Sequence, residues 1–355
     1  VMGTACIGNP DKYFDDFYNV LKGDYTLEYS KYKKLTEENE QNKFDIAAAL
    51  QKATEKITKE TMTPFIEKYK MKNLCLSGGV ALNSVMVGKM YDWYDGIVEN
   101  IYIPPVPYDA GLAIGSAQYV YHQIFDKPRV VWEDNTSPYL GTTYDYEEIK
   151  KSLDTSDDIL KGLNNHKCSL KYDNATDDEV IELLSKDNNV ISVFHGGSES
   201  GRRALGNRSI LADPRSPDMK DIINEKVKHR QWFRPFAPSI IREEVKNWFE
   251  RDIESPYMTT VLKFKENVKD KVPAVVHLDG TGRLQTVTEN DNKWYYNFIK
   301  KFGEKTGVPI VLNTSFNDRE PIVETPEHAV NCFLGTDIDY LYFCDANILV
   351  EKIKD

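Results

Sequence analysis

Hydrophobic positions recur along the chain with two different periods, which together predict alternating helices and strands. Residues 44–70 carry apolar side chains at helical spacing, among them Ile46, Leu50, Ile57 and Phe65. The apolar run LCLSG predicts a buried strand, and after a tight turn at Gly78-Gly79 the run ALNSVMVGKM predicts a helix. A second strand, turn and helix follow in IYIPPVPYDAGLAIGSAQYVYHQ. Such repetition indicates an α/β fold.

The second half of the chain continues this alternation. We expect helices in DDEVIELLSKDNN, in MKDIINEKVKHRQWF before Pro235, in NKWYYNFIKKFGEKTG up to Gly307, and in TPEHAVNCFLGT after an N-cap at Thr325. Strands are expected in VISVFHGG and VPIVLNTSF, and VPAVVHLDGTGRLQTV predicts two strands joined by a DGTG turn. Residues 9–45 are polar, aromatic and charged. This composition predicts an irregular surface region of the kind found in insertions.

Length and composition predict two domains. A chain of 355 residues is longer than one ordinary core requires. Residues 128–165 are polar and are interrupted by Pro138 and Gly141, which favours a boundary there. We therefore assign residues 1–130 and 171–355 to two domains and residues 131–170 to a linker.

The overall charge and the cysteines narrow the class of protein. With 45 Lys+Arg against 56 Asp+Glu the formal net charge is −11, which argues against broad nucleic-acid binding. The five cysteines are scattered without a CxxC pair, so structural zinc and a disulfide framework are not expected. No apolar run approaches the ~20 residues of a membrane span, and the first residues do not resemble a secretory signal. A cytoplasmic protein without membrane contact is expected.

Positive charge nevertheless gathers in GRRALGNRSILADPR, which holds four arginines in fifteen residues. Further cationic loops follow, and Arg203, Lys228, Arg234 and Arg283 all have Gly or Pro nearby. Guanidinium groups bind phosphate or carboxylate oxygens in pairs, so these loops predict a site for a small anion. Alternatively, the arginines tie loops to backbone carbonyl groups and to carboxylates, for which Glu199, Asp213, Asp218 and Asp279 are available.

Polar groups near these loops are candidates for the same site. Asn313, Thr314, Ser315 and Asn317 supply neutral donors in VLNTSFN. His277 beside Asp279 forms either a catalytic pair or a satisfied histidine at a strand end. Six histidines without HxxxH or HExxH spacing cannot make a complete metal site by themselves.

Two motifs in the first half have both a functional and a structural interpretation. The glycines of LSGGVALN could let backbone N–H groups approach a phosphate at a helix N-terminus, or could form only a packing turn. No GK[ST] follows, so this is not a P-loop. Asp109 at the next turn is either a metal or phosphate-cation ligand or an N-cap.

Six motifs, taken in their order along the chain, resemble the O-carbamoyltransferase family, which includes nodulation-factor and antibiotic carbamoyltransferases. They are LSGGVALN, DAGLAIGSA, ESGRRALGNRSILADPR, VKHRQWFRPFAPS, HLDGTGRLQTV and VLNTSFN. The resemblance extends from near residue 1 to about residue 350. It implies the C-terminal part of an actin-like, Kae1-like ATPase domain in residues 1–130. It also implies a YrdC-like domain with a mixed sheet in residues 171–355.

The resemblance also implies an ATP-dependent reaction and its site. Carbamoyl phosphate and ATP, with Mg²⁺, would form carbamoyl-adenylate in the YrdC-like domain, and the carbamoyl group would pass to the hydroxyl of a small-molecule acceptor. The family's pocket falls on Arg203, Lys228, Arg234, Arg283 and Ser315. Substrate-binding positions are expected at Gly78, Gly79, Asn83, His277, Asn313, Thr314 and Asn317, and Asp109 is the candidate ligand of Fe²⁺ or a similar metal.

One departure from the family pattern leaves two further hypotheses open. VMGTACIGNP resembles a motif from the middle of the Kae1-like domain, and the paired histidines that normally precede it are not in this sequence. We therefore expect transfer to need an N-terminal segment or a partner chain. A nucleotide-binding module that completes a partner is one alternative. A tRNA threonylcarbamoyl-adenylate synthase is another, although such an enzyme is expected to lack LSGGVALN and DAGLAIGSA.

Overall fold

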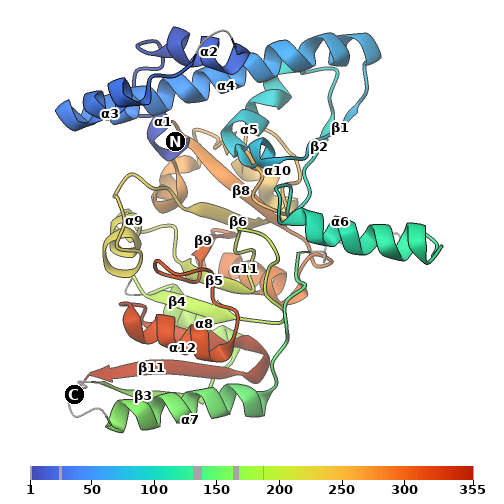
Figure 1. The fold of residues 1–355 in the computed structure, drawn as a ribbon. Helices are drawn as coiled ribbons and strands as arrows, with labels where there is room; N and C mark the ends of the chain where they lie inside the picture. The colour runs from blue at the N-terminus through green and yellow to red at the C-terminus, as the bar shows by residue number, and fades with distance from the viewer. Residues whose placement is uncertain (1, 24–25, 131–137, 163–167, 187, 355) are drawn as a thin grey trace.

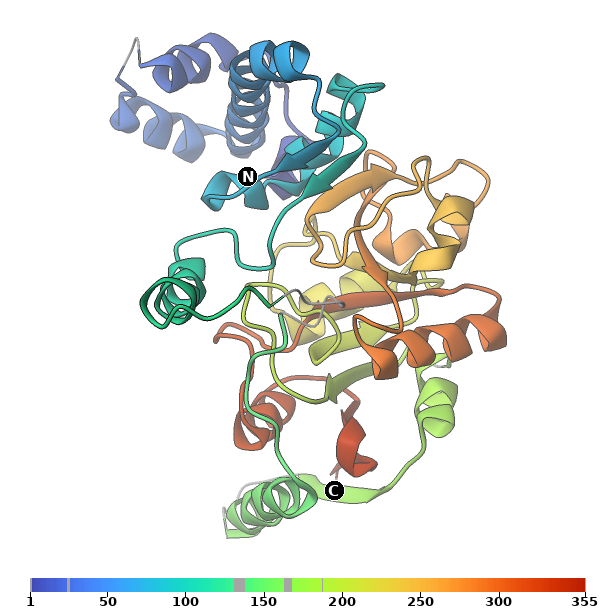
Figure 2. The same cartoon turned by 90° about the vertical axis from the view of Figure 1, so that its right-hand side faces the viewer.

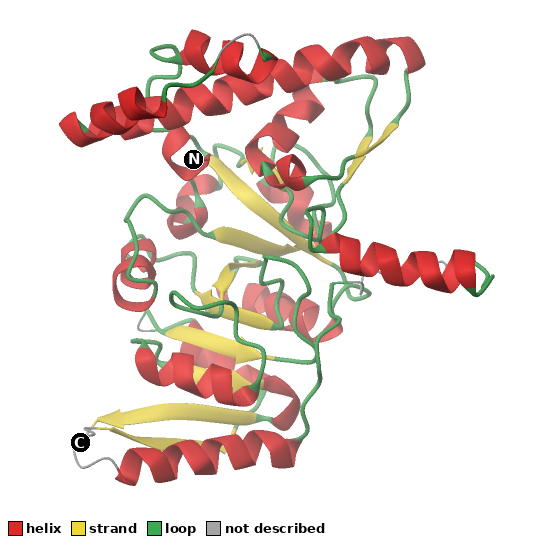
Figure 3. Cartoon of the chain, viewed as in Figure 1, coloured by secondary structure: helices red, strands yellow, loops and turns green. Residues whose placement is uncertain are grey.

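The computed structural model describes residues 2–23, 26–130, 138–162, 168–186 and 188–354, which form a smaller, mainly helical lobe and a larger lobe built on a mixed sheet (Figure 1). Helices dominate the smaller lobe, whereas most strands lie in the larger one (Figure 3). The α/β class expected from the alternating pattern is confirmed. The assignment of the smaller lobe to an actin-like fold remains a prediction.

The smaller lobe is organised around one long helix, α4 (Glu40–Tyr69), which confirms the helix expected over 44–70. Its other elements, in chain order, are α1 (Met2–Ala5), α2 (Phe14–Lys22), α3 (Tyr29–Glu38), β1 (Asn73–Cys75), the 3₁₀ turn η1 (Gly79–Leu82), α5 (Ser84–Trp93), β2 (Asn100–Tyr102), α6 (Gly111–Tyr119) and the π-helical turn η2 (Val120–Ile124).

The expectation of an irregular surface region over 9–45 was wrong. Helices α2 and α3 occupy much of it and pack on α4, where Phe17 and Tyr32 are buried against Ala49 and Ala53. The aromatic residues that suggested an insertion supply this apolar contact. Burial of aromatic rings stabilises helices whose own sequences are strongly polar.

The two strands of the smaller lobe pair in parallel, with Leu74 opposite Ile101. The strand in LCLSG is thus confirmed, but its predicted burial was wrong because β1 alternates between exposed and half-buried residues. Helix α6 projects from the molecule in Figure 1, is seen end-on in Figure 2, and has no buried residue. The apolar helix expected there therefore exists, but it is exposed.

The described residues of the larger lobe form nine strands in the order β3-β11-β10-β4-β5-β9-β6-β8-β7. These strands are β3 (Cys168–Asn174), β4 (Val190–Phe194), β5 (Arg208–Ala212), β6 (Ala237–Ile241), β7 (Thr260–Lys263), β8 (Thr281–Val287), β9 (Ile310–Ser315), β10 (Tyr340–Phe343) and β11 (Ile348–Lys354). Parallel pairs (β4–β10, β6–β8) and antiparallel pairs make the sheet mixed.

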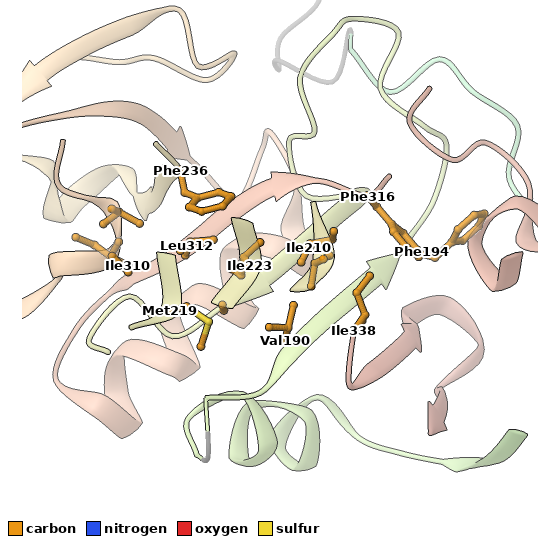
Figure 4. Close-up of a cluster of buried hydrophobic side chains, with 14 of the residues drawn as sticks. Val190, Phe194, Ile210, Met219, Ile223, Phe236, Ile310, Leu312, Phe316 and Ile338 are labelled. Carbon is orange, nitrogen blue, oxygen red and sulfur yellow. The ribbon is translucent and has the colours of Figure 1, made fainter. Parts of the chain in front are cut away.

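Helices cover this sheet: α7 (Tyr146–Gly162), α8 (Asp177–Leu184), α9 (Met219–Ile222), α10 (Val245–Trp248), α11 (Lys293–Thr306) and α12 (Pro326–Gly335). A central core includes Val190, Ile210 and Leu312 from the strands and Phe316 directly after β9 (Figure 4). Thr325 caps α12 by accepting a hydrogen bond from the backbone of His328, as the sequence predicted.

Two segments differ from the expected secondary structure, and a third lies at the expected domain boundary. Residues 273–275 form a 3₁₀ turn, so only the second of the two strands expected in VPAVVHLDGTGRLQTV exists, and it pairs with β7. The helix expected up to Phe233 ends in the π-helical turn η3 (Ile223–Val227), before Pro235. Helix α7 lies within the predicted linker and packs on α12, while the division into domains remains a prediction.

Candidate anion-binding site between the lobes

A cavity of about 870 Å³ lies between the two lobes. From the smaller lobe, α1, α4 and α5 contribute polar side chains that include Gln51, Lys52, Glu55 and Lys89. The larger lobe supplies most of the charge, through Arg203, Lys220, Arg230, Arg234, His277, Asp279 and Arg283. Cationic groups from four separate segments of the larger lobe thus face one space.

Loops between the strands of the large sheet position three of these arginines, and a strand positions the fourth. Arg203 lies in the connection between β4 and β5, and Arg230 and Arg234 lie between η3 and β6. Arg283 lies within β8, opposite Val261 of β7. Since β4, β5, β6 and β8 belong to one sheet, Arg203 and Arg283, 80 positions apart in the sequence, line the same cavity.

Burial and mutual repulsion act on these guanidinium groups together. The pKa of Arg283 is lowered to about 9, by burial first and then by the charges of Arg203 and Arg230. Burial, with Arg234 as the second cause, lowers the pKa of Arg230 to about 10. Burial also lowers the pKa of Arg203. Within the described part of the chain, none of these four arginines forms an ion pair with a carboxylate.

Partly buried cations without carboxylate partners are costly, and a bound anion offsets that cost. Arg230 has neutral support, since its Nε donates to Asn224 Oδ1 at 2.7 Å and its guanidinium lies 4.8 Å from the Phe236 ring centroid. The four arginines are therefore candidates to bind an anion in this cavity.

The four arginines of GRRALGNRSILADPR have different environments. Only Arg203 lines the cavity. Arg202 lies over the ring of Tyr108, with 4.3 Å between guanidinium carbon and ring centroid. Arg208 is fully buried and donates to the carbonyl oxygens of His195, Gly196, Asn207 and Glu324. Arg215 pairs with Asp213. The alternative interpretation, in which arginines join loops together, thus holds for Arg208 and Arg215.

Lys228 forms a separate cluster with the VLNTSFN segment. Its Nζ donates to Asn317 O at 2.6 Å, to Asn317 Oδ1 at 2.8 Å, to Ser315 Oγ at 3.3 Å and to Ser315 O. Burial, followed by the charge of Arg230, lowers its pKa to about 7. Lys228, Ser315 and Asn317 are not in the cavity wall as the structure describes it, but Lys228 lies close enough to Arg230 for their charges to interact.

His277 lines the cavity as a neutral imidazole. Burial and then Arg283 lower its pKa to about 4, although Asp279 opposes this. Its Nδ1 lies 3.0 Å from Thr281 Oγ1, and Asp279 Oδ1 accepts a hydrogen bond from the Thr281 hydroxyl at 2.6 Å. Thr281 therefore lies between the two side chains that the sequence suggested as a pair.

The remaining candidate substrate-binding residues lie outside the cavity wall. Asn313 is buried, and its amide donates to Ala204 O and Gln285 Oε1. Thr314 is half-buried in β9. The glycines Gly78 and Gly79 are exposed, and the Gly78 N–H donates to Pro107 O at 2.6 Å. In the described residues these groups support loops and strands around the site.

Asn83 has a supporting role too. Its side chain caps α5 by accepting from the Met86 N–H, and it exchanges hydrogen bonds with the Gln51 amide at 3.0 and 3.1 Å. Gln51 in turn donates to Glu55, which pairs with Lys89 at 2.7 Å. The LSGGVALN motif is thereby connected to the smaller lobe's face of the cavity.

The described residues do not form a metal site. No three His, Cys, Asp or Glu side chains among them gather closely enough to hold a metal ion. Asp109 is exposed at the start of α6. A single carboxylate is too few ligands for a transition metal, so we derive no chemical step through a metal.

Sequence reasoning missed two groups of residues that line the cavity. Arg230 lies between Lys228 and Arg234, the two residues that the sequence had suggested, and Lys220 lies upstream in α9. The high local density of basic residues could have indicated both. The smaller lobe's Gln51, Glu55 and Lys89 gave no sequence signal, because they lie on ordinary helices.

Comparison with known proteins identifies the family. The model described as carbamoyltransferase N-terminus matches residues 11–118, and the one described as carbamoyltransferase C-terminus matches residues 182–352. Together these matches cover most of the chain and include every arginine of the cavity wall.

Curated relatives agree with this result. Nodulation protein NolO of Bradyrhizobium diazoefficiens is 36% identical over 96% of this chain and 63% of its own length. Nodulation protein NolNO of Sinorhizobium fredii is 37% identical over 96% of this chain and 51% of its own length. A Synechocystis protein described as uncharacterized is 38% identical over 85% of this chain and 51% of its own length.

The chain thus spans about half to two thirds of the length of these relatives. Full-length HypF, solved in its phosphate- and nucleotide-bound form, matches 53% of this chain and 23% of that chain at 16% identity, but its TM-score of 0.31 supports no argument. No described helix is both long and apolar enough to cross a membrane. The family models and the relatives lead to one conclusion: the chain belongs to the carbamoyltransferase family.

Proposed function

We propose that this chain makes carbamoyl-adenylate from ATP and carbamoyl phosphate in the cavity between its lobes. One observation carries the proposal: Arg203, Arg230, Arg234 and Arg283 face a single cavity and lack carboxylate partners among the described residues. Membership of the carbamoyltransferase family supports the proposal that carbamoyl is the group that is activated and transferred.

The proposed chemistry needs this concentration of positive charge. Carbamoyl phosphate and water give carbamate and phosphate, and a carbamate oxygen then attacks the α-phosphorus of ATP and displaces pyrophosphate. Both the nucleophile and the triphosphate are anionic, so their approach is opposed by repulsion. Arginines that are fixed in the cavity before the substrates arrive offset this repulsion and stabilise the charge on the leaving pyrophosphate. Mg²⁺ would enter with ATP as part of that substrate.

We assign Lys228 and Ser315 a supporting role in this proposal. A lysine with a pKa near 7 is charged or neutral according to what binds nearby, and Arg230 connects it electrostatically to the cavity. A bound phosphate would favour its charged form. Neutral His277 would contribute a hydrogen bond rather than a charge.

The experiment is pyrophosphate exchange into ATP, measured with and without carbamoyl phosphate and accompanied by mass spectrometry of the products. Arg283→Ala is expected to abolish exchange that depends on carbamoyl phosphate. Arg129→Ala, which removes an exposed arginine outside the cavity wall, is the matched control and is expected to leave exchange unchanged. Exchange at the wild-type rate in Arg283→Ala would refute the assignment of the site.

Transfer to a hydroxyl acceptor is proposed to need a further segment or a partner chain. Helix α6 and the residues after it expose large apolar side chains, namely Leu112, Tyr119, Val120, Tyr121, Ile124, Phe125 and Val130. Contiguous exposed apolar surface of this kind marks contacts with other protein surface. The greater length of the relatives is consistent with such a contact.

This second proposal concerns only the transfer step. Carbamoylated product formed per ATP consumed, with a sugar or another alcohol as acceptor, is expected to be low for this chain alone. Near-stoichiometric transfer by the 355 residues alone would contradict it.

A further inference from the structure

We propose that Ser84 is a positioning residue for Arg283, so that the contact of α5 with β7 and β8 sets the geometry of the anion site. Nothing in the sequence pattern distinguished Ser84, which follows the LSGGVALN motif. The inference rests on the proposed function, since it assumes that Arg283 binds an anion.

The contact joins the two lobes at the cavity wall. Arg283 Nε donates to Ser84 Oγ at 3.2 Å, across 199 positions of sequence. Ser84 is fully buried. Within the described residues the terminal nitrogens of Arg283 make no hydrogen bond to protein, so both remain available to an oxyanion. Use of Nε alone therefore orients the guanidinium without occupying its binding edge.

The same face of α5 also determines how closely the helix approaches the sheet. Ser84 and Gly88 are one turn apart and share a face. Helix α5 packs against β7, and a Cβ on Gly88 would overlap the carbonyl oxygen of Val261. Val261 is the partner of Arg283 in the β7–β8 register. Glycine at 88 thus brings the helix close enough for Ser84 to reach Arg283.

The start of α5 is itself fixed. Asn83 caps the helix and holds the Gln51 amide of α4 through two hydrogen bonds. Consequently Ser84 cannot shift without disturbing α4, which also lines the cavity. Arg203 and Arg230 repel Arg283, and without an acceptor at Ser84 its flexible side chain would turn away from them. Fixing the side chain in advance lowers the entropic cost of binding an anion.

Titration calorimetry with inorganic pyrophosphate tests the inference. Ser84→Ala is expected to raise the dissociation constant about tenfold, in line with losing one hydrogen bond to a charged group. Gly88→Ala, which separates α5 from Val261, is expected to weaken binding in the same direction. Asp92→Asn is the control, because it removes an exposed contact of α5 with Arg251 at the other end of the helix. Its dissociation constant should equal that of wild type.

A double-mutant cycle separates positioning from general destabilisation. In the Arg283→Ala background, Ser84→Ala is expected to have no further effect on pyrophosphate binding, because the group that it orients is gone. Wild-type affinity in Ser84→Ala, or an equal loss of affinity in both backgrounds, would overturn the inference. If wild type and Asp92→Asn also fail to bind pyrophosphate, the anion site itself, and with it the proposed function, is refuted instead.

Discussion

Replacing Lys228 with methionine should remove a specific pH dependence from the stability of this protein. Lys228 is only 3% exposed and is surrounded by oxygen acceptors of Ser315 and Asn317. Burial and the charge of Arg230 outweigh these hydrogen bonds and bring its pKa down from 10.5 to about 7. The folded protein therefore releases a proton that the unfolded chain retains between about pH 7 and pH 10.5.

The size of the effect follows from that difference. At about 1.4 kcal/mol per pKa unit, the lowered pKa corresponds to about 5 kcal/mol of preference for the neutral amine. Because the unfolded chain binds more protons in this window, the free energy of unfolding rises with pH. Linkage gives a rise of about 2 kcal/mol between pH 7 and pH 9 from Lys228 alone. Below about pH 7 both states are protonated, so the pH dependence disappears while the cost of burying the charged amine is at its largest.

Urea denaturation at pH 7, 8 and 9 measures this contribution. The difference in free energy of unfolding between wild type and Lys228→Met should grow by about 2 kcal/mol over that range in favour of wild type. Taking the difference cancels the titration of Arg283 and other groups common to both proteins. Lys33→Met, which changes an exposed lysine on α3, is the control and should give a constant difference. Parallel curves for wild type and Lys228→Met would refute the reasoning.

Three further results are expected from the same structure. Gly206→Ala should lower the free energy of unfolding by about 2 kcal/mol or more in urea denaturation, because Gly206 has φ +122 and a Cβ there would lie 2.5 Å from the Tyr295 ring. Arg208→Ala should cost about 3 kcal/mol or more in the same assay, since it leaves buried carbonyl oxygens without donors, whereas Arg129→Ala should cost little. After dialysis against a mild chelator, the chain should retain far less than one equivalent of Fe²⁺, and Asp109→Asn should not change that amount; stoichiometric iron measured by atomic absorption would contradict this.

Features that depend only on neighbouring residues were predictable before the fold was known. The alternation of apolar runs and helical periodicity gave the α/β class, and Thr325 marked the start of α12 because a cap requires only residues within one turn. Cationic loops near Gly or Pro predicted an anion site, and Arg203, Arg234 and Arg283 do line one cavity. These signals are short in range, so they can be read without knowing the fold.

Burial and the role of each charge, by contrast, depend on how distant segments pack together. Helices α2 and α3 depend on packing against α4, and β1 is exposed despite its apolar sequence. Arg203 and Arg208 are five residues apart in one motif, yet one faces the cavity and the other is buried among backbone carbonyl groups. Burial and electrostatic interaction are sums over segments that are distant in sequence. The pairing of Ser84 with Arg283 across 199 positions exists only because α5 docks on the sheet.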